Sequence, residues 1–579
     1  MDNELMIRDQ IKEDLEKALK SLQIEQGKVE VSRTTDSRNG DYTSNVSLKI
    51  AGKLKPFDVS QDKQSPMEVA KKITDSIGIL PHIEKLEVKE PGFINFFVKN
   101  DFWQDEVEKV LKEEVLSLGG PKLKIIVEFT DPNPFKEFHI GHLYSNIVGE
   151  SISRLLEATG AVVKRANYQG DIGMHVAKTI WGIPKLLDQI GEKFEDIEKK
   201  DLGARVFFLG QAYSLGAKEF EASQGVKAEI AEINKKIFAK DPSVLAIYEK
   251  GKKWSLDYFE QIYERLGTKF DFYYLESEVG EVGAKIVREF LEKGVFIKSE
   301  GAIVFPGEKY GLHSRVFINS LGLPTYEAKE LGLAPTKYKD FAYDESVIVT
   351  GNEINDYFKV LLAALAQVAP ELAVKTRHIS HGMVRMPGGK MSSRLGNVLL
   401  GEWLLDEAKK RVIEAFEEVP AEVAEQIGVG AIKYALLKGN IGQDVNFTFE
   451  EAISLSGNSG PYLQYAYARC RSVLAKSNKQ HAKSNKFDLE NLEPEESALL
   501  RTLGHFEEVV LDAAESFAPS ALANFLYEAA QKYNSLYNNL PILKAGEKER
   551  GRRLFLTRAT ADVLKKGLSL LGIAAPEKM

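Results

Sequence analysis

The sequence predicts an α/β protein with a parallel sheet at its centre, a small α+β unit ahead of it and an all-α region behind it. Residues 123–129 are a short β-branched and aromatic run between turn residues, which is typical of a buried strand. A helix with apolar positions at helical spacing follows and ends near Gly160, and Ala161–Ala166 offers a second strand. Strand, helix and strand in this order build parallel, nucleotide-binding sheets. From Asp406 onward helical patterns dominate.

The composition is that of an ordinary globular protein. The chain has 579 residues, enough for three to five domains, with 44% hydrophobic and 28% charged residues. Its net charge of −8 means that any polyanion must be met by local basic patches. The single cysteine, Cys470, excludes an internal disulfide. No apolar run reaches membrane length and the N-terminus is charged, so we expect no membrane contact and a cytoplasmic location.

The chemistry is predicted at the junction of the first strand and its helix, where His139-Ile140-Gly141-His142 opens the helix. Free backbone N–H groups and the positive helix end favour an anion there, and Gly141 allows close approach of a nucleotide. The imidazoles of His139 and His142 can donate to phosphate oxygens without a full fixed charge. Taken alone, the four residues could also be a chance match or half of a metal site.

The flanking segments extend the motif. Residues 128–136, EFTDPNPFK, precede it, and residues 167–173, NYQGDIG, follow the second strand. With the HIGH signature, they resemble the active site of class I aminoacyl-tRNA synthetases, most closely that of arginyl-tRNA synthetases. The resemblance implies a Rossmann-like catalytic domain of the class I synthetase type, expected over residues 116–405.

The first 115 residues are expected to form a small α+β domain. Helices are expected over Met1–Leu22, Ser47–Lys55 and Ser65–Ile77, and strands over Leu86–Glu90 and Phe93–Val98. The strings GDYTSNVSLKIAGKL and PGFINFFV are similar to the N-terminal domain of arginyl-tRNA synthetases, which touches the outer corner of tRNA. The resemblance implies that Asn45 belongs to the tRNA-binding set.

Residues 178–298 are strongly helical and rich in charge, and we interpret them as an insertion between two halves of the nucleotide fold; their charge runs are usually solvated helix faces. The sheet is expected to resume with Ala302–Phe305, Arg315–Ile318 and Ser346–Thr350. Tyr326 and Glu330 are four residues apart and share a face if helical. Such a pair is most often a surface pair, but the matching tyrosine and acid of the family hold the substrate arginine. The family acid is usually Asp.

Within residues 378–397, the glycines at 388, 389 and 396 flank a lysine, two hydroxyls and an arginine, which is the donor set for a triphosphate. The spacing is not that of a P-loop. The segment resembles the second class I signature, KMSKS, with Ser393 in place of the second lysine. Arginyl-tRNA synthetases commonly carry a lysine just ahead of HIGH instead, and Lys136 stands there. The resemblance implies an ATP site made of His139, Gly141, His142, Lys390, Met391, Ser392, Ser393 and Arg394.

Residues 406–579 are expected to form an all-α anticodon-binding bundle. Its helices are expected at Gly430–Asn440, Glu450–Ser454, Pro461–Lys476, Glu496–Phe517, Ser520–Leu536 and Arg553–Leu571. Aromatic and basic side chains suit an unpaired RNA loop, although tyrosines at helical spacing are more often core residues. SLSGNSGPYLQYAYARCRSVL and LGIAAPEKM resemble the anticodon-binding domain of the family. This implies tRNA contacts from Tyr462, Gln464, Tyr465, Arg469 and Met579.

As a whole, the resemblance implies an arginine–tRNA ligase. It would use ATP with Mg²⁺ to convert L-arginine to arginyl-adenylate, pass the arginyl group to tRNA(Arg), need no structural metal and act as a monomer. His139, His142, Lys136 and Lys390 would neutralise charge on the phosphates. Paired carboxylates match a guanidinium, which points to Glu128 and Glu330; Asn133 and Tyr326 would fix the α-amino end or orient the acids. A family glutamine aligns with Ile354, so that contact is unassigned. The family also needs bound tRNA before it activates arginine.

Two alternatives remain at this point. Another class I synthetase would share both signatures, but two acids in the pocket disfavour a glutamate substrate, and the lack of a Cys/His zinc set disfavours the cysteine enzyme. A catalytically inactive tRNA-binding relative should have lost HIGH or the lysine loop, and both motifs are present.

Overall fold

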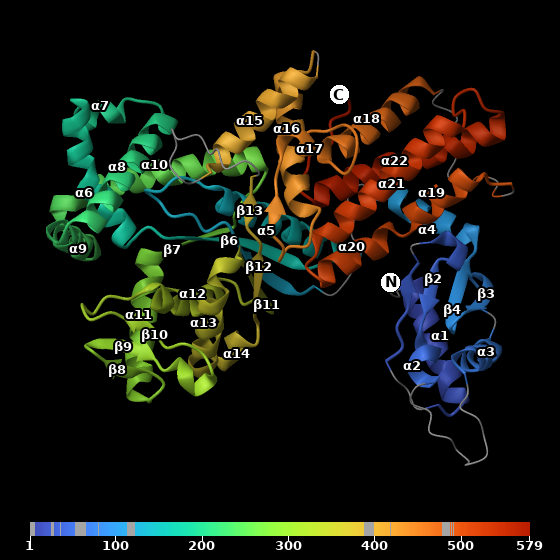
Figure 1. The fold of residues 1–579 in the computed structure, drawn as a ribbon, viewed down its shortest axis with the longest axis horizontal. Helices are drawn as coiled ribbons and strands as arrows, with labels where there is room; N and C mark the ends of the chain where they lie inside the picture. Colours follow the sequence, from blue (N-terminus) through green and yellow to red (C-terminus); the bar gives the residue numbers. More distant parts are fainter. Residues whose placement is uncertain are drawn as a thin grey trace.

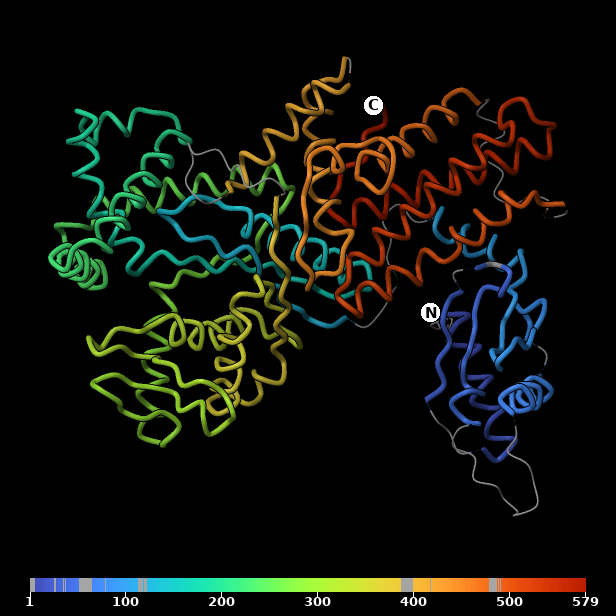
Figure 2. Tube along the Cα trace, viewed as in Figure 1, coloured from blue at the N-terminus to red at the C-terminus, as the bar shows by residue number. Residues whose placement is uncertain are grey.

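The structure, a computed structural model, has three parts (Figure 1). It describes residues 6–24, 28–34, 36–51, 65–78, 80–112, 118, 122–386, 399–416, 418–477, 487, 489 and 491–579. A small N-terminal unit (blue) packs against a bundle of helices (orange and red), and the central sheet with its covering helices lies on the other side of that bundle. Figure 2 shows that the N-terminal unit contacts the bundle and lies away from the central sheet.

The N-terminal unit is an antiparallel sheet of order β1-β2-β4-β3, covered by helices. Its elements are α1 (Ile7–Ser21), β1 (Ser32–Arg33), η1 (Ser37–Asn39), β2 (Tyr42–Ser44), α2 (Val46–Ala51), α3 (Pro66–Ser76), β3 (Ile83–Lys89), β4 (Phe93–Val98) and α4 (Asn100–Lys112). Helix α3 begins with a capping box between Ser65 and Glu68, which satisfies free N–H groups of its first turn. The predicted α+β class is therefore confirmed.

The central sheet contains five parallel strands in the order β12-β11-β5-β6-β7. They are β5 (Lys124–Glu128), β6 (Val162–Gln169), β7 (Phe272–Leu275), β11 (Glu345–Gly351) and β12 (Thr376–His381), and α5 (Ile140–Ala158) connects β5 to β6. The chain moves outward from β5 to β6 and β7, then returns to the other side of β5 as β11 and β12. Ligands of such sheets bind at the carboxyl ends of the strands where this reversal occurs, here between β5 and β11.

The predicted helical insertion proves too long. Its helices are α6 (Met174–Ile190), α7 (Phe194–Glu198), α8 (Leu202–Ala222), α9 (Gln224–Phe238), α10 (Pro242–Leu266) and α11 (Glu276–Glu292). Between α10 and α11, however, β7 joins the central sheet next to β6. The strand has four residues, so the helical periodicity of its long neighbours hides it in the sequence.

The expectation that Ala302–Phe305 and Arg315–Ile318 belong to the central sheet is wrong. They are β9 (Ala302–Phe305) and β10 (Arg315–Ile318), which form a separate antiparallel sheet with β8 (Ile297–Ser299). The short connection between them holds only η2 (Gly307–Tyr310) as regular structure, and parallel neighbours need a crossover of a dozen residues or more. The third expected strand is correct, because β11 lies beside β5.

The second half of the catalytic region covers one face of the central sheet with helices. These are α12 (Tyr326–Asp340), η3 (Asn352–Ile354), α13 (Asn355–Val368) and α14 (Pro370–Ala373). In Figure 1 they lie below the sheet with α11 and the small sheet, whereas α6–α10 lie above and to the left. Strand β12 takes in His378 and His381.

The last third is helical, as predicted. It contains α15 (Gly401–Ala415), α16 (Ala421–Leu437), α17 (Phe449–Ala452), α18 (Gly460–Lys476), α19 (Pro494–Gly504), α20 (Phe506–Glu515), α21 (Pro519–Asn539) and α22 (Glu547–Leu570), with β14 (Val445–Asn446) paired to β13 (Val384–Arg385). The single helix predicted over Glu496–Phe517 is two helices, divided at His505. Gly504 is a weak helix former, and Trp103 of α4 packs on His505 at a ring separation of 4.4 Å.

Helix α5 is buried almost all round because the bundle covers the face that the sheet does not. Its Ser151 hydroxyl donates to Leu570 O at 3.2 Å, and Arg154 donates to Ser569 O at 3.0 Å. Nearby, the buried Lys433 of α16 donates to Leu266 O and Gly572 O, at 2.6 and 2.5 Å. These bonds join the end of α22 to the central helix of the nucleotide fold.

The N-terminal unit docks on α19 and α20 through charged groups. Glu508 accepts a hydrogen bond of 2.5 Å from the Tyr42 hydroxyl, and Asp512 pairs with Arg8 at 2.7 Å. Arg501 pairs with Asp41 at 2.5 Å. These bonds join the N-terminal unit directly to the helical bundle. Among the described residues, no helix combines the length and the apolar character needed to span a membrane.

Candidate active site

The HIGH residues cap helix α5 with their own side chains. His139 is the N-cap residue, and its Nδ1 accepts from the backbone N–H groups of Gly141 at 3.1 Å and His142 at 3.4 Å. His142 Nδ1 in turn accepts from the backbone N–H of His139 at 3.3 Å. This is a capping box made of two histidines, and the rings stack at a centroid distance of 3.6 Å.

Both imidazoles are neutral and present their second nitrogen as a donor. Burial lowers the pKa of His139 to about 4, with a further contribution from the charge of Lys136. Burial likewise lowers the pKa of His142 well below its ordinary value. Since each Nδ1 accepts a backbone N–H, the proton of each neutral ring resides on Nε2. The helix end therefore offers two N–H donors to an anion.

Gly141 is required by the histidine cap as much as by any ligand. A Cβ atom on Gly141 would lie 3.0 Å from both Cε1 and Nδ1 of His139. This is tighter than an ordinary contact, so with a larger residue the His139 ring would have to shift by a few tenths of an ångström.

The segment before HIGH is held in an unusual backbone conformation. Thr130, Asp131 and Phe135 have positive φ values of 80°, 47° and 68°. Each such residue costs about 1–3 kcal/mol and persists only when its surroundings fix it. Here Ser145 Oγ accepts from the Thr130 N–H at 3.0 Å, and Ser255 Oγ accepts from the Phe135 N–H at 2.9 Å.

Lys136 follows this turn, and its ammonium lies against Tyr213 of α8. Its Nζ is 5.1 Å from the centre of the Tyr213 ring. Burial and the charge of Lys178 lower its pKa, while the negative charge of Glu276 acts in the opposite direction. The charge of Lys136 also lowers the pKa of both HIGH histidines, so Lys136 adds positive potential at the start of α5.

Glu128, predicted to bind a guanidinium, already has a partner. It is 1% exposed, and its Oε2 accepts from the ammonium of Lys337, which also donates to Ser346 Oγ at 3.2 Å. Lys337 lies on α12, two turns after Glu330. A buried ion pair of this kind is costly to break, because the surviving charge has no water around it.

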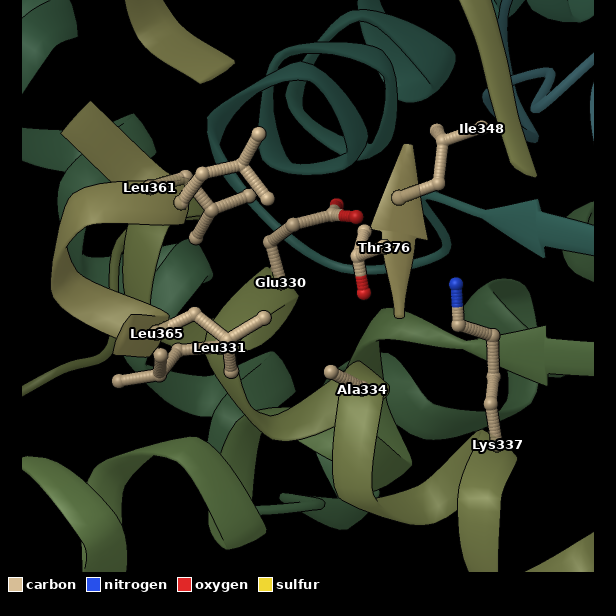
Figure 3. A pocket seen from close by; sticks show the side chains of 9 residues that line it. Glu330, Leu331, Ala334, Lys337, Ile348, Leu361, Leu365 and Thr376 are labelled. Carbon is tan, nitrogen blue, oxygen red and sulfur yellow. The ribbon is translucent and has the colours of Figure 1, made fainter. Parts of the chain in front are cut away.

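Glu330 points into a narrow pocket beside this pair (Figure 3). Its carboxyl lies near Thr376 and Ile348, and Lys337 reaches toward Ile348 from the opposite side. Burial raises the pKa of Glu330 well above its ordinary value, and the charge of Glu128 raises it further. Lys337 opposes both effects, so Glu128, Glu330 and Lys337 form one electrostatic group.

The other predicted arginine contacts lie around this group. Tyr326 is the first residue of α12 and is 52% exposed, so the four-residue spacing from Glu330 is indeed helical. Asn133 belongs to the strained turn, and its Oδ1 approaches Gly170. Asp131 is partly buried and accepts from the Tyr168 backbone N–H at 2.8 Å. Burial and the charge of Glu128 raise the pKa of Asp131 well above its ordinary value.

Two buried groups in this region were not identified from the sequence. Glu276 is the first residue of α11 and follows β7 directly; it is 4% exposed, and its Oε2 lies 2.6 Å from Nζ of Lys329. Burial raises the pKa of Glu276 to about 7 although Lys329 opposes the shift. An acid placed immediately after a short aromatic strand was the available signal, but recognising it required recognising β7.

The predicted ATP residues Lys390, Met391, Ser392, Ser393 and Arg394 lie outside the described residues. The chain on both sides of them is placed at the site. Strand β12 ends at His381, whose ring packs on Tyr144 of α5 at 4.4 Å. On the return, Leu399 O accepts from the Ile140 N–H at 2.9 Å, and the Gly401 N–H donates to Phe138 O at 2.8 Å. The segment therefore leaves and rejoins the fold beside HIGH.

A groove of about 910 Å³ lies in the bundle, between α18, the end of α21 and the last residues. Tyr465, Arg469 and Met579, all predicted to contact tRNA, line it together with Tyr537 and Lys544. The Arg469 guanidinium is 4.9 Å from the centre of the Tyr465 ring and 5.0 Å from that of Tyr537. The groove thus combines positive charge with aromatic faces, which suits unpaired bases.

The remaining predicted tRNA residues differ in position. Gln464 is fully buried, and its amide donates to Gln426 O and Ala574 O at 3.1 and 2.8 Å, so it holds the chain end in place instead of facing the groove. Tyr462 is partly buried and accepts from Asn534 Nδ2 at 2.8 Å. Asn45 precedes α2, and its buried Oδ1 has no hydrogen-bond partner among the described residues. Contact with RNA stays a prediction for Asn45, Tyr462 and Gln464.

Comparison with known proteins agrees with this geometry. A family model for the catalytic domain of class I (R) tRNA synthetases matches residues 106–449, one for the DALR anticodon binding domain matches residues 463–579, and one for the arginyl tRNA synthetase N terminal domain matches residues 6–98. A parallel sheet with HIGH at the start of α5, matched in this way, defines a class I aminoacyl-tRNA synthetase.

The curated relatives narrow the class further. Arginine–tRNA ligases of Porphyromonas gingivalis (30% identity, 97% of this chain and 98% of the relative) and Fusobacterium nucleatum (31%, 95% of both chains) are similar along nearly the whole length. The solved Thermus thermophilus arginyl-tRNA synthetase is 26% identical, with a TM-score of 0.81 over 99% of this chain and 100% of that one. The chain belongs to the arginyl-tRNA synthetase family. Its activity is arginyl-tRNA synthesis, with ATP, L-arginine and tRNA as substrates, and neither alternative drawn from the sequence receives support.

The histidine cap predicts a separation between stability and activity at His139. In His139→Asn, the shorter side chain can still accept the N–H groups of the first turn, as asparagine does at ordinary N-caps, but it loses the donor at the Nε2 position. We expect stability to urea within about 1 kcal/mol of wild type and a kcat for arginine-dependent ATP–pyrophosphate exchange reduced about 100-fold, as when one transition-state donor is removed. The exposed His313→Asn serves as the control. Equal losses of stability and activity would show that the cap alone matters.

Proposed function

We propose that the HIGH histidines and Lys136 assist attack of the arginine carboxylate on the α-phosphate of ATP, giving arginyl-adenylate and pyrophosphate. The observation that carries this proposal is the pair of neutral imidazoles at the start of α5, whose outward N–H donors lie close to Lys136. No side chain forms a covalent bond to substrate. Catalysis consists of positioning and of neutralising the charge that develops on the phosphate oxygens.

The rest of the phosphate site would come from the second signature. Lys390, Met391, Ser392, Ser393 and Arg394 would bind the phosphates of ATP, since the described residues on either side of them contact α5 and the residues at its start. Mg²⁺ would arrive with the ATP and shield its phosphate charges. No group of three or more His, Cys, Asp or Glu side chains in the described parts of the chain is arranged to hold a metal ion.

The arginine site is proposed between β5, α11 and α12. Glu128, Asp131 and Glu330 lie around a single lysine, Lys337, so the substrate guanidinium would supply the second positive charge that this group of acids needs. Glu330 is the best candidate for direct contact, because Glu128 is already paired with Lys337. Asn133, Tyr326 and Glu276 would complete the site around the same substrate.

For tRNA we propose that the groove lined by Tyr465, Arg469 and Met579 binds anticodon bases, and that Tyr462 and the region of Asn45 contact other parts of the tRNA.

The proposed domains are residues 1–115, 116–405 and 406–579. The order of the matched families supports this division. Helices α15 and α16 contact both α5 and neighbouring helices of the bundle. We also propose a monomer that acts in the cytoplasm.

Substitution of Glu330 tests the arginine site. Glu330→Gln should weaken arginine binding by about 2–3 kcal/mol, the usual contribution of a hydrogen bond to a charged group in a desolvated site. The matched control is Glu327→Gln, on the same helix, where the acid pairs with Arg315 at 3.1 Å. Calorimetric titration with arginine in the presence of tRNA measures both. Unchanged affinity in Glu330→Gln would show that this acid does not meet the substrate.

Substitution of Lys136 tests the phosphate site. In Lys136→Ala we expect kcat for adenylate formation to fall on the order of 100-fold, whereas the Kd for arginine should change less than about twofold, because the lysine acts mainly in the transition state. The exposed Lys185→Ala is the control. A defect confined to arginine affinity would place Lys136 in the amino-acid site.

The link between the bundle and α5 predicts dependence of the first step on tRNA. Arg154 and Ser151 donate hydrogen bonds to the end of α22. Gln464 donates to Ala574 O and so holds the residues that follow α22 beside the groove. A tRNA bound in the groove can shift the catalytic region only if it binds the active arrangement more tightly. Arginine-dependent exchange should be near background without tRNA and appear with cognate tRNA. A noncognate tRNA is the control, and strong exchange without any tRNA would exclude the coupling.

A further inference from the structure

Lys329 is a buried cation at the edge of the proposed arginine site. It is 3% exposed, and its ammonium donates to Glu276 Oε2 at 2.6 Å and to Ile172 O at 3.2 Å. The same nitrogen lies 4.9 Å from the centre of the Tyr326 ring. The sequence gives Lys329 no role, and the phosphate chemistry proposed above does not use it.

The position of this lysine is fixed by close contact between α11 and α12. A Cβ on Gly283 would lie 1.7 Å from Ala328 O, and one on Gly332 would lie 2.4 Å from Val279 O. Only glycine at both positions allows the two backbones to approach this closely. Lys329 therefore projects across a rigid contact onto Glu276, the first residue of α11.

The second oxygen of Glu276 lies near Gly170, the residue that follows β6. A Cβ atom on Gly170 would lie 3.4 Å from Glu276 Oε1 and 2.2 Å from Asn133 Oδ1. Two acceptors therefore converge above a residue that has no side chain: Glu276 from the start of α11 and Asn133 from the strained turn that leads to Lys136.

We infer that Lys329 is a positioning residue of the amino-acid site, which holds one oxygen of Glu276 and favours the charged form of that carboxylate, so that its other oxygen can accept an N–H of arginine. The inference rests on the proposed arginine site. It adds a residue that does not touch the substrate but sets the charge of one that does.

The charged and titratable groups around Glu276 come from several elements. They are Lys329, Tyr326 and Glu330 on α12, Asp171 and Tyr168 at the end of β6, Lys136 ahead of α5 and Tyr357 on α13. Asp171 is itself held by Tyr248 at 2.9 Å and by Lys252 at 3.8 Å. Lys329 is the only one of these cations within hydrogen-bond distance of Glu276 in the described structure.

The pH dependence follows from this arrangement. Burial raises the pKa of Glu276 to about 7 with Lys329 in place, and loss of the lysine would raise it further. Glu276 would then carry a proton at neutral pH, and arginine could bind only with release of that proton. Because arginine favours the ionised form, the penalty for losing Lys329 is largest at low pH and diminishes as pH rises through the new pKa.

The test compares arginine affinity of the full chain with bound tRNA between pH 6 and 9. Wild type, Lys329→Met and Lys329→Arg are titrated calorimetrically, with the exposed Lys339→Met on the same helix as the control. We expect the Kd ratio of Lys329→Met to wild type to fall by up to about tenfold per pH unit above neutrality. Lys329→Arg should keep a ratio close to one at every pH. If Lys329→Met does not fold, Lys329→Gln keeps the length and polarity without the charge and should show the same trend.

Two results would overturn the inference. A ratio that is constant with pH would give Lys329 a purely structural role, and tighter binding by Lys329→Met would make the lysine a competitor of the substrate. Glu276→Gln separates this failure from failure of the arginine site. If Glu276→Gln binds arginine like wild type, the proposed site is wrong at this position; if it binds weakly while the Lys329→Met ratio stays constant, only the role of Lys329 fails.

Discussion

The catalytic region depends on two lysines that α12 buries against acids at the edge of the central sheet. Lys329 pairs with Glu276 after β7, and Lys337 pairs with Glu128 at the end of β5. A buried ammonium is costly without a close partner, and each of these two has a carboxylate, so the two pairs fix both the height and the rotation of α12 over the strands. Tyr326 and Glu330 lie on the same helix, and their position in the site follows from these pairs.

The phosphate end of the site depends on a different constraint: the free backbone N–H groups at the start of α5 must be satisfied by nearby side chains. The HIGH imidazoles satisfy free N–H groups of α5 with one nitrogen and keep the other for a ligand. The turn before them has positive φ at three residues that are not glycine, and serine hydroxyls of α5 and α10 hold it. A strained but fully bonded turn places Asn133 and Lys136 without relying on a flexible loop.

Local patterns predicted the parts of this architecture that are determined locally. The β5–α5–β6 unit, the HIGH helix start and the shared face of Tyr326 and Glu330 all follow from spacing along the chain. Contacts between residues far apart in the sequence could not be predicted in this way. Lys337 and Glu128 are 209 residues apart in the sequence, and neither segment carries a sign that they pair. The sequence therefore indicates only the substrate as a partner for Glu128. Strand β7 has four residues, too few to show the alternation of a strand in the sequence. Glu276, which follows it, therefore cannot be recognised as a site residue from the sequence. Gln464 lies on α18, and its side chain is buried because it bonds to Ala574 near the end of the chain. The sequence of the helix alone does not show this contact.

The burial of α5 also sets an order of events during synthesis of the protein. Ser151 of this helix can form its hydrogen bond to Leu570 O only after a further 419 residues have been synthesised. At a ribosomal speed of roughly 5–20 residues per second, the delay is about 20–80 s. Until α15, α16 and the later helices of the bundle have been synthesised, the apolar side of the HIGH helix lacks the cover that they provide. The nascent chain therefore offers a binding surface to molecular chaperones, and the catalytic centre matures only near the end of translation.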